Sequence, residues 1–524
     1  MKKLIWLCLL LFSGLNLLSQ TPSQPLELPN FIIEGKEQID VQIGTKQIPS
    51  YPTYLERSTI DSLIIIGKPR NYILFPTSFP TTIISRSFPD GYLIGKIGSF
   101  FTLDLSAGYR TNFKGYDIFG FGSFNVSKGH IENANYTKLQ LGLQTDYVAP
   151  EKFYIFGGSK TTTNIDFSFR NYKLYALNNA PARSQIFFAP QINSIGHFEG
   201  FDFKTGANLA TANQIGADKN LVENFLGGFL EVSTKTFSIP FGGRISLDIR
   251  SFESSSTNFF EFYGYSTLNV NEFKIEPTLG LQFARTSFGK TRPMALISVA
   301  ASKMIHPNLL IWSSISNKIK NFSLNVFISQ NPYLSDSLAI DYPHIIEMNG
   351  KAKFQPNNDF ALTFSVGYSI NNRLPSFNFV RLGYFDIQYP DATIFSLSLE
   401  GFWTNPLVGT FSASAKINST SQSDNKKEVP NIPTLNFRAD YSRNFLEKIK
   451  LTAFFEFVGR RFADLENSLT LDSYNNLGFK VDYLYNSSAQ ISINLENLLN
   501  SNIVNWYGYK EWGFNFKICV TYKF

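Results

Sequence analysis

Few residues in the chain have the types and spacing that chemistry requires. The four histidines, His130, His197, His306 and His344, stand apart and lack the i+2 or i+4 spacing of metal ligands. No G-x-S-x-G motif marks a hydrolase nucleophile. Cys519 is the only cysteine outside the first twenty residues, so neither an internal disulfide nor a redox pair is expected. We therefore expect no catalytic residue, no metal and no cofactor. A surface-exposed hydrolase whose residues meet only at a rim is the alternative.

Charged side chains at alternating positions form a second set of candidates. They carry both signs, and in a water-filled lumen such charges set the selectivity for passing solutes. Pairing and hydration along the wall of a barrel is the alternative interpretation. The lumen-facing candidates are Asp104, Arg110, Arg244, Asp248, Arg250 and Lys517, with Lys138, Asp146, Lys416 and Glu456 as further members.

The elements that position these charges are strands, because apolar and polar residues alternate with a period of two. The last segment has one wholly apolar face, formed by Trp512, Phe514, Phe516, Ile518, Val520, Tyr522 and Phe524. Similar segments of roughly ten residues, separated by Asn, Gly, Asp and Pro, recur from about residue 92 to the end of the sequence. We interpret 119–122, which reads Phe-Gly-Phe-Gly, as a strand with its small residues towards the lumen.

Composition separates a membrane barrel from a soluble sandwich. Aromatic residues make up 16% of the chain and charged residues only 17%, whereas a soluble domain is about 25% charged. A soluble sandwich would need a larger charged exterior, and intrinsic disorder would need few aromatics. The net charge of +6 is spread over 524 residues, which is not a nucleic-acid signature. The sequence predicts an all-β fold, a transmembrane antiparallel β-barrel of about 20–22 strands over residues 91–524, in contact with outer-membrane lipid.

The first ninety residues are of a different kind. Lys2 and Lys3 precede a short apolar run that ends near Ser19, which predicts a signal peptide over 1–19, with a membrane anchor as the alternative. Residues 20–90 are rich in proline and have no sustained period, so we expect an irregular periplasmic arm. This arm would occlude the lumen or bind a periplasmic partner; a disordered tail is the alternative.

The C-terminal residues carry a family resemblance. The stretch 494–500 reads Asn-Leu-Glu-Asn-Leu-Leu-Asn, 506–509 reads Trp-Tyr-Gly-Tyr, and the chain closes on Tyr522 and Phe524. This pattern resembles the end of a TonB-dependent receptor barrel, and residues 27–35 are similar to the segment that leads into the plug of such receptors. The resemblance implies that the barrel-assembly machinery reads Tyr522 and Phe524. Residues 20–90 are too few for a complete plug, so we expect a receptor-like barrel without one.

Together these observations predict a barrel in the outer membrane of a Gram-negative-type bacterium. Its expected function is transport or receptor-type uptake of a solute, with no nucleic-acid partner. A structural or assembly barrel whose arm binds a periplasmic partner is the alternative. The identity of the solute is left open by the sequence.

Overall fold

The structure is a computed structural model that describes residues 90–216, 219–234, 239–252, 255–286, 289–445 and 448–524. The predicted signal peptide and, apart from Asp90, the predicted arm lie outside these residues. Among the described residues, the one α-helix is α3 (Leu324–Gln330), and no helix there is long and apolar enough to cross a membrane.

Twenty-two antiparallel strands form the wall of the barrel. The first eleven are β1 (Gly91–Gly98), β2 (Thr102–Phe113), β3 (Tyr116–Ser127), β4 (Tyr136–Val148), β5 (Lys160–Lys173), β6 (Ala182–Phe198), β7 (Phe201–Ile215), β8 (Asn220–Thr234), β9 (Phe241–Phe252), β10 (Ser255–Ser266) and β12 (Phe273–Arg285). The others are β13 (Thr291–His306), β14 (Leu309–Ile319), β15 (His344–Asn357), β16 (Phe360–Asn372), β19 (Ala392–Asn405), β20 (Gly409–Gln422), β21 (Leu435–Phe445), β22 (Ile449–Val458), β25 (Tyr474–Leu484), β26 (Ala489–Glu496) and β29 (Asn515–Lys523). The short β11 (Leu268–Val270) pairs with β12 alone.

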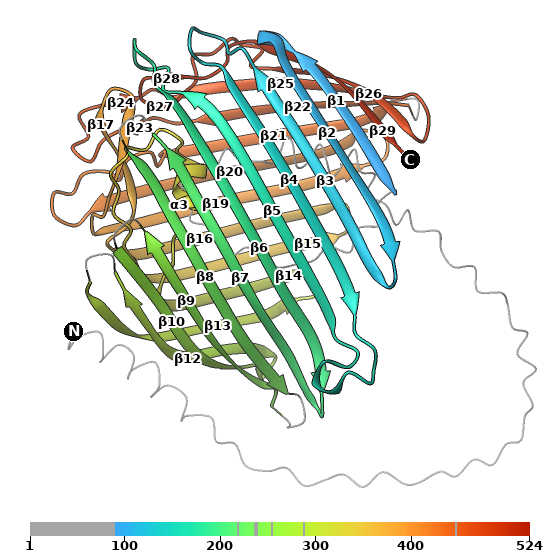
Figure 1. The fold of residues 1–524 in the computed structure, drawn as a ribbon, viewed down its shortest axis with the longest axis vertical. Helices are drawn as coiled ribbons and strands as arrows, with labels where there is room; N and C mark the ends of the chain where they lie inside the picture. The colour runs from blue at the N-terminus through green and yellow to red at the C-terminus, as the bar shows by residue number, and fades with distance from the viewer. Residues whose placement is uncertain (1–89, 217–218, 235–238, 253–254, 287–288, 446–447) are drawn as a thin grey trace, which may run out of the picture. The chain divides into compact units, whose positions relative to one another are not determined.

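The wall is closed because the first strand pairs with the last. β1 lies antiparallel to β29 from Tyr92 opposite Lys523 to Gly98 opposite Lys517, and the blue and red strands lie side by side (Figure 1). At the end of this seam, Gly91 N donates to the carbonyl oxygen of Phe524 at 2.7 Å and Phe524 N donates back at 3.0 Å. A closed sheet leaves no unpaired edge, which is what a hydrocarbon environment requires. The predicted all-β barrel of about 20–22 strands is therefore confirmed, with 22 strands.

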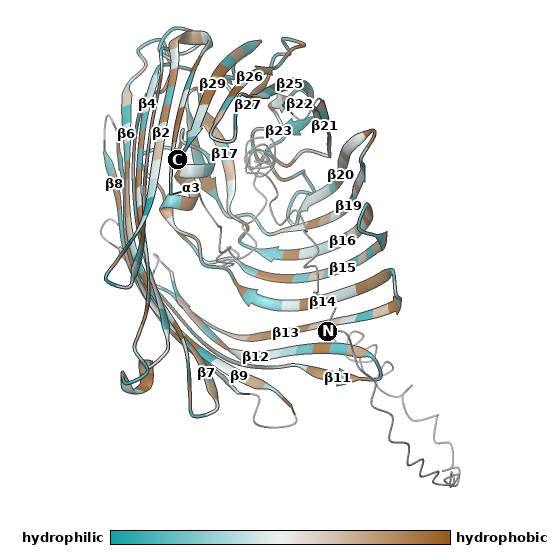
Figure 2. Ribbon diagram, turned by 90° about the vertical axis from the view of Figure 1, so that its right-hand side faces the viewer, coloured by the Kyte–Doolittle hydropathy of each residue, from teal (hydrophilic) through white to brown (hydrophobic). Residues whose placement is uncertain are grey.

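The two faces of the wall differ as the alternation predicts. On β29, Phe516, Val520 and Tyr522 are 43%, 50% and 48% exposed, whereas Asn515 and Cys519 on the other face are 2% and 7% exposed. Exposed apolar side chains recur at alternate positions around the barrel, and the strands alternate in hydropathy along their length (Figure 2). Apolar residues therefore cover the outside of the barrel, where lipid is the solvent.

One detail of the predicted alternation is wrong. Phe119 lies opposite Arg110 on the lumen face, so the two phenylalanines of 119–122 point inward and the glycines outward. The ring of Phe121 lies over Gly142 of the next strand, where an added Cβ would come 2.2 Å from the ring. Phe121 can point into the lumen because Gly142 beside it has no side chain and leaves room for the ring. A rule that places every apolar side chain on the outer face does not anticipate such a pair.

The connections differ in length at the two ends of the barrel. At one end, which we call the short-turn side, several are two-residue turns, such as 114–115, 199–200, 307–308 and 358–359. The other end, the long-loop side, has the connections 320–343, 373–391, 423–434, 459–473 and 497–514. The long-loop side also contains the small hairpins β17 (Ser376–Arg381) with β18 (Tyr384–Gln388), β23 (Arg461–Phe462) with β24 (Thr470–Leu471), and β27 (Val504–Trp506) with β28 (Tyr509–Lys510).

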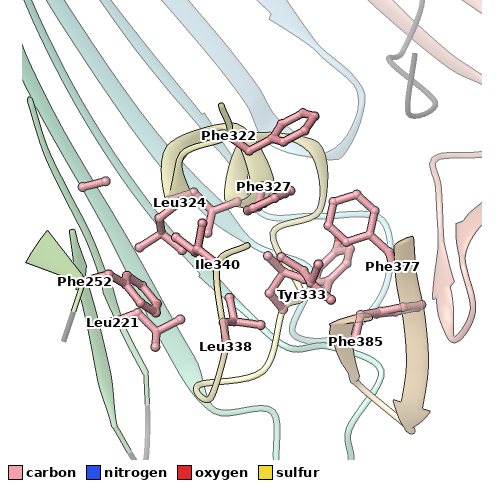
Figure 3. Close-up of a cluster of buried hydrophobic side chains, with 14 of the residues drawn as sticks. Leu221, Phe252, Phe322, Leu324, Phe327, Tyr333, Leu338, Ile340, Phe377 and Phe385 are labelled. Carbon is pink, nitrogen blue, oxygen red and sulfur yellow. The ribbon is translucent and has the colours of Figure 1, made fainter. Parts of the chain in front are cut away.

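The largest buried apolar cluster lies inside the barrel towards the long-loop side. We call it the mouth cluster; its buried members are Tyr172, Leu174, Ala212, Leu221, Phe252, Phe322, Leu324, Phe327, Ile328, Tyr333, Leu334, Leu338, Ile340, Phe377, Phe385, Ile387 and Tyr509. Figure 3 shows the side chains of the 320–343 connection between Leu221 and Phe252 of the wall and Phe377 and Phe385 of β17 and β18. The long connections thus pack into the barrel and form a hydrophobic core there.

Candidate functional site

The connection 320–343, which we call the internal loop, turns into the barrel after β14. Its helix α3 begins after Ser323, whose Oγ accepts a hydrogen bond from Val326 N at 3.4 Å, as an N-cap side chain does. The helix buries Leu324, Phe327 and Ile328 in the mouth cluster. Figure 2 shows α3 within the curve of the wall. Tertiary packing must hold this helix in place, because a helix of seven residues is not stable alone.

Two buried charges on β8 and β9 hold the start of the internal loop. Arg250 Nε lies 2.6 Å from Glu223 Oε1, and both side chains are nearly inaccessible, at 4% and 3%. Arg250 Nη1 also donates to the carbonyl oxygen of Phe322 at 2.7 Å. Glu223 Oε2 accepts from Leu324 N at 2.8 Å. The ion pair therefore satisfies backbone groups of the loop that burial would otherwise leave without partners.

A second pair of wall residues, on β5 and β6, holds the middle of the loop. Arg183 is 2% exposed, and its Nη2 lies 2.7 Å from Asp336 Oδ1. Its Nη1 donates to the carbonyl oxygen of Leu334. Tyr172 OH donates to the carbonyl oxygen of Pro332. Five donors in a planar fork suit arginine to such multiple contacts.

Asp341 holds the end of the loop. Its side chain is fully buried, and its Oδ1 lies 3.4 Å from Arg292 Nη1 of β13. Arg373, which follows β16, forms a second ion pair with it. Tyr389 OH accepts from Asp341 N at 3.1 Å and donates to the carbonyl oxygen of Ala339 at 2.8 Å. The internal loop is thus attached to the wall at its start, middle and end.

Neighbouring connections interlock with the internal loop. Phe385 N of β18 donates to the carbonyl oxygen of Tyr333 at 3.0 Å, and Ser335 N donates to that of Phe385 at 2.6 Å. The ring of Tyr333 stacks on Tyr509 of β28 at 3.4 Å between centroids and 9° between planes. Tyr509 OH donates to the carbonyl oxygen of Gly383 at 2.8 Å. Three separate connections therefore meet in one cluster.

The motif that carries the family resemblance shapes the base of the last connection. Asn497 and Asn500 adopt positive φ of 50° and 47°, a conformation that asparagine tolerates better than most residues. The amide of Asn497 accepts from Ser501 N at 2.8 Å and donates to the carbonyl oxygen of Trp512 at 3.2 Å. Asn500 Oδ1 accepts from Phe514 N at 3.0 Å. These contacts tie both ends of 497–514 together above β26 and β29.

His130, in the connection between β3 and β4, contacts the same region. Its Nε2 donates to the carbonyl oxygen of Lys510 at 2.8 Å, and its ring lies edge-on to Phe100 and Tyr175. Burial lowers the pKa of His130, because the charged imidazolium loses hydration among these rings. Burial likewise raises the pKa of the hydroxyls of Tyr333 and Tyr509. The neutral forms of all three side chains suit this apolar contact.

A cavity of about 1110 Å³ lies beside α3. Its lining comes from β1 to β6, from β25, β26 and β29, from α3 and from the 497–514 connection. Asp104, Lys138 and Lys517, all predicted to face the lumen, line this cavity. A space of this size on the inner wall is large enough for a small-molecule ligand.

The structure places the other predicted lumen residues away from this cavity. Arg110 makes a two-point ion pair with Asp117 across β2 and β3, with Nε to Oδ1 at 2.6 Å. Arg244 lies over the ring of Phe229 at 4.1 Å and 3.4 Å from Glu231.

Asp248 and Arg250 contact the internal loop rather than open solvent. Asp248 Oδ2 accepts from Asn321 Nδ2 at 2.6 Å, and Arg250 makes the contacts described above. Whether any of the predicted charges selects a solute stays a prediction.

Sequence reasoning missed Arg183, Glu223 and Tyr172. Each stands in an alternating strand like many others, and its contact with the internal loop joins residues about 100 or more positions apart in the sequence. A signal for the loop itself was present: residues 320–343 interrupt the alternation for longer than a turn needs, and Ser323 precedes an apolar run.

The described residues do not assemble an obvious chemical centre. Among them, no group of three or more His, Cys, Asp or Glu side chains could hold a metal ion. The distinctive arrangement in this part of the chain is instead a lumen partly filled by its own loops, with a polar cavity beside them.

Comparison with known proteins gives similarity in structure but not in sequence. No family model matches the chain, and no curated protein sequence matches it. The solved structures that it resembles include the FrpB iron transporter from Neisseria meningitidis, at 8% identity and a TM-score of 0.67 over 84% of this chain and 82% of that one. The copper transporter OprC gives 10% identity and a TM-score of 0.67 over 84% and 82%. The ferric yersiniabactin uptake receptor FyuA from Yersinia pestis gives 11% and 0.62 over 84% and 80%.

At these identities the likeness concerns the fold. It extends over most of each chain and confirms the predicted resemblance at the level of the fold. Each of the three structures is described as a transporter or a receptor, not as an enzyme. The described part of this chain has the fold of a TonB-dependent receptor-like outer-membrane barrel.

Proposed function

We propose that the chain takes up a solute across the outer membrane of a Gram-negative-type bacterium. The observation that carries this proposal is a closed 22-strand barrel whose lumen contains a cavity of about 1110 Å³ beside the internal loop. Outer-membrane barrels have short periplasmic turns and longer extracellular loops, so the long-loop side faces the exterior. The solute enters from that side, occupies the cavity and passes when the internal loop moves.

Similarity in fold to transporters and an uptake receptor supports the proposal that this barrel takes up a solute. The structures named above include iron, copper and siderophore transporters or receptors. The described residues offer no three-residue metal site, so we do not extend the metals of those proteins to this chain. The cavity, rather than a metal centre, is the proposed binding site.

The two ends of the chain complete the proposal. Residues 1–19 direct export, and residues 20–90 form an arm that occludes the lumen from the periplasm or docks a periplasmic partner. Tyr522 and Phe524 serve as the signal for barrel assembly. Their position supports this role: both rings are exposed on the outer face, 48% and 50%, and stack at 5.9 Å.

Single-channel conductance in a planar bilayer tests the proposal. The refolded chain without its signal is compared with a variant that also lacks residues 20–90. Conductance in either protein supports transport, and conductance only after the deletion identifies the arm as an occluding segment. A further pair of variants replaces the internal loop with a short linker in each of the two proteins. If none of these proteins conducts, the barrel does not transport, and a structural role through the arm follows.

A further inference from the structure

We propose that the cavity binds a small zwitterion, an amino acid or short peptide with one ammonium and one carboxylate group. This inference rests on the proposed function and specifies its substrate class. It is carried by four charged side chains of the lining that form no ion pair within 4.0 Å among the described residues, and by three buried acceptor oxygens without donors there.

Three polar residues lie side by side on the wall at one level. Lys96 of β1 is directly opposite Asp104 of β2, and Asp104 is directly opposite Asn125 of β3. All three line the cavity. Neighbouring strands are about 5 Å apart, so a single small molecule can contact a cation, a carboxylate and an amide in this row.

A second group continues from β29. Lys517 lies opposite Gly98, whose missing side chain leaves room for the stem of the lysine; an added Cβ would come 2.7 Å from Lys517 Cγ. The ammonium group of Lys517 lies 5.1 Å from the ring centre of Trp512. Glu496 of β26 lies opposite Asn515 of β29, and both residues line the cavity.

These charges are not paired with each other. Within the described ranges, no ion pair within 4.0 Å includes Lys96, Asp104, Glu496 or Lys517. Three buried acceptor oxygens also have no hydrogen-bond donor among the described residues: Oδ1 of Asp104, of Asn125 and of Asn515. Asn515 is only 2% exposed. Buried acceptors without donors are costly, so they indicate a partner that supplies N–H groups.

The charges without ion pairs and the acceptor oxygens without donors together indicate the chemistry of the ligand. An ammonium group donates to the oxygens of Asp104 and Asn125, and a carboxylate accepts from the ammonium groups of Lys96 and Lys517. The lining holds four Lys or Arg and four Asp or Glu residues, so it has no excess of one sign that would favour a simple anion or cation. A molecule with both charges satisfies more of these groups than a molecule with one.

Equilibrium dialysis of the refolded full chain with radiolabelled glycylglycine tests this inference. Glycylglycine should bind, while N-acetylglycine, which lacks the ammonium, and glycinamide, which lacks the carboxylate, should bind about tenfold or more weakly, because each loses a charge-assisted contact. These comparisons use the unmodified protein, so no folding defect enters.

Two variants place the bound molecule. Asp104→Asn should weaken glycylglycine binding about tenfold, because it removes the charge that holds the ammonium group of the ligand. Lys517→Gln should also weaken binding about tenfold, because it removes a charge that holds the carboxylate group. Glu400→Gln and Lys351→Gln make the same chemical changes at strand positions outside the cavity lining and should bind as the native chain does. Equal binding by all five proteins would overturn the inference, as would preferential binding of an uncharged sugar such as sucrose.

The inference and the proposed function can fail separately. If the barrel conducts or admits sucrose into liposomes but does not bind glycylglycine, transport stands and the zwitterion is wrong. If glycylglycine binds with the predicted variant pattern but no solute crosses, the site stands and the transport proposal is wrong.

Discussion

At the scale of single residues, buried charges of the lumen wall hold a loop in place. Arg183, Glu223 and Arg250 are each less than 5% exposed and contact backbone groups of the internal loop. Burying an ion costs several kcal/mol, which a good partner geometry roughly offsets. Such residues therefore fix the position of the loop more than they add to the free energy of unfolding. Removing one partner of the pair is strongly destabilising because the other charge stays buried without compensation, whereas replacing both partners with apolar residues is often neutral.

Replacing Arg183 with methionine should loosen the internal loop. The substitution removes the ion pair to Asp336 and the hydrogen bond to Leu334, at a cost of about 3–5 kcal/mol for a broken buried pair. Cys519, the only cysteine among the described residues, lies on the lumen face and reports the opening. A charged thiol reagent added outside intact cells should label Cys519 faster in Arg183→Met than in the native chain.

Arg438→Met is the matched control for that substitution. Arg438 pairs with Asp440 at 2.7 Å on the same strand and lies over the ring of Phe454 of β22, so these partners belong to the wall and not to the internal loop. Labelling at the native rate is expected there. Equal rates in all three proteins would contradict the assignment of Arg183 as an anchor of the loop.

Acid should weaken the contact between His130 and the 497–514 connection. The folded pKa of His130 lies below its ordinary value of 6.5, so the unfolded chain takes up a proton first. Stability rises with pH wherever the unfolded state binds more protons, so the contact is strongest above that value and is lost progressively as the pH falls below it. Hydrogen exchange of amides 503–511, corrected for intrinsic rates, should be faster at about pH 5.5 than at about pH 7.5.

His130→Gln keeps a side-chain donor for the carbonyl oxygen of Lys510 but cannot titrate. It should remove most of the pH dependence. His197→Gln, at an exposed histidine of β6, should leave that dependence intact. An unchanged pH response in His130→Gln would assign the effect to another titratable group.

At the scale of elements, the lumen side of each strand is shaped by its neighbours. Phe121 lies over Gly142, and Lys517 lies over Gly98. The glycine supplies the space into which the larger residue folds, so the two strands fit closely while keeping their ladder of hydrogen bonds. At Gly98 the constraint includes backbone, because an added Cβ would come 2.4 Å from the carbonyl oxygen of Phe516.

Gly98→Ala should therefore weaken the seam between β1 and β29. The new methyl group meets backbone that cannot rotate away, and overpacking of this kind costs about 1–3 kcal/mol. Gly95→Ala on the same strand is the control, since its Cβ would lie 3.8 Å from Leu105, an ordinary contact. The midpoint of thermal unfolding should fall for Gly98→Ala and stay near the native value for Gly95→Ala. Equal midpoints would mean that the seam adjusts.

At the scale of the whole molecule, the wall and the internal loop are separable. The wall is closed by backbone hydrogen bonds from β1 round to β29, and none of these requires the loop. The loop instead occupies part of the lumen and completes the mouth cluster (Figures 2 and 3). Closure of the wall and packing of the loop are therefore two separate features of the fold.

Replacing residues 321–342 with a short Gly-Ser linker should open the lumen without unfolding the barrel. The variant should keep the circular dichroism of a β-barrel and show larger single-channel conductance than the native chain. The physical reason is that, in the native chain, apolar side chains of the internal loop fill space that water would occupy in the variant. A variant that folds but conducts no better would place the barrier elsewhere, for example in residues 20–90.

The sequence by itself determined the architecture, because a period of two and an apolar outer face are local properties of each strand. The alternation from Phe514 to Phe524, in and beside β29, and the closing aromatic residues were readable for that reason. Only the tertiary structure decided what the lumen contains. Asp248 and Arg250 looked like solute-facing charges, yet they contact a loop that lies seventy residues further along the chain. Contacts between residues so distant in sequence depend on how the closed wall brings them together, and no local pattern encodes that.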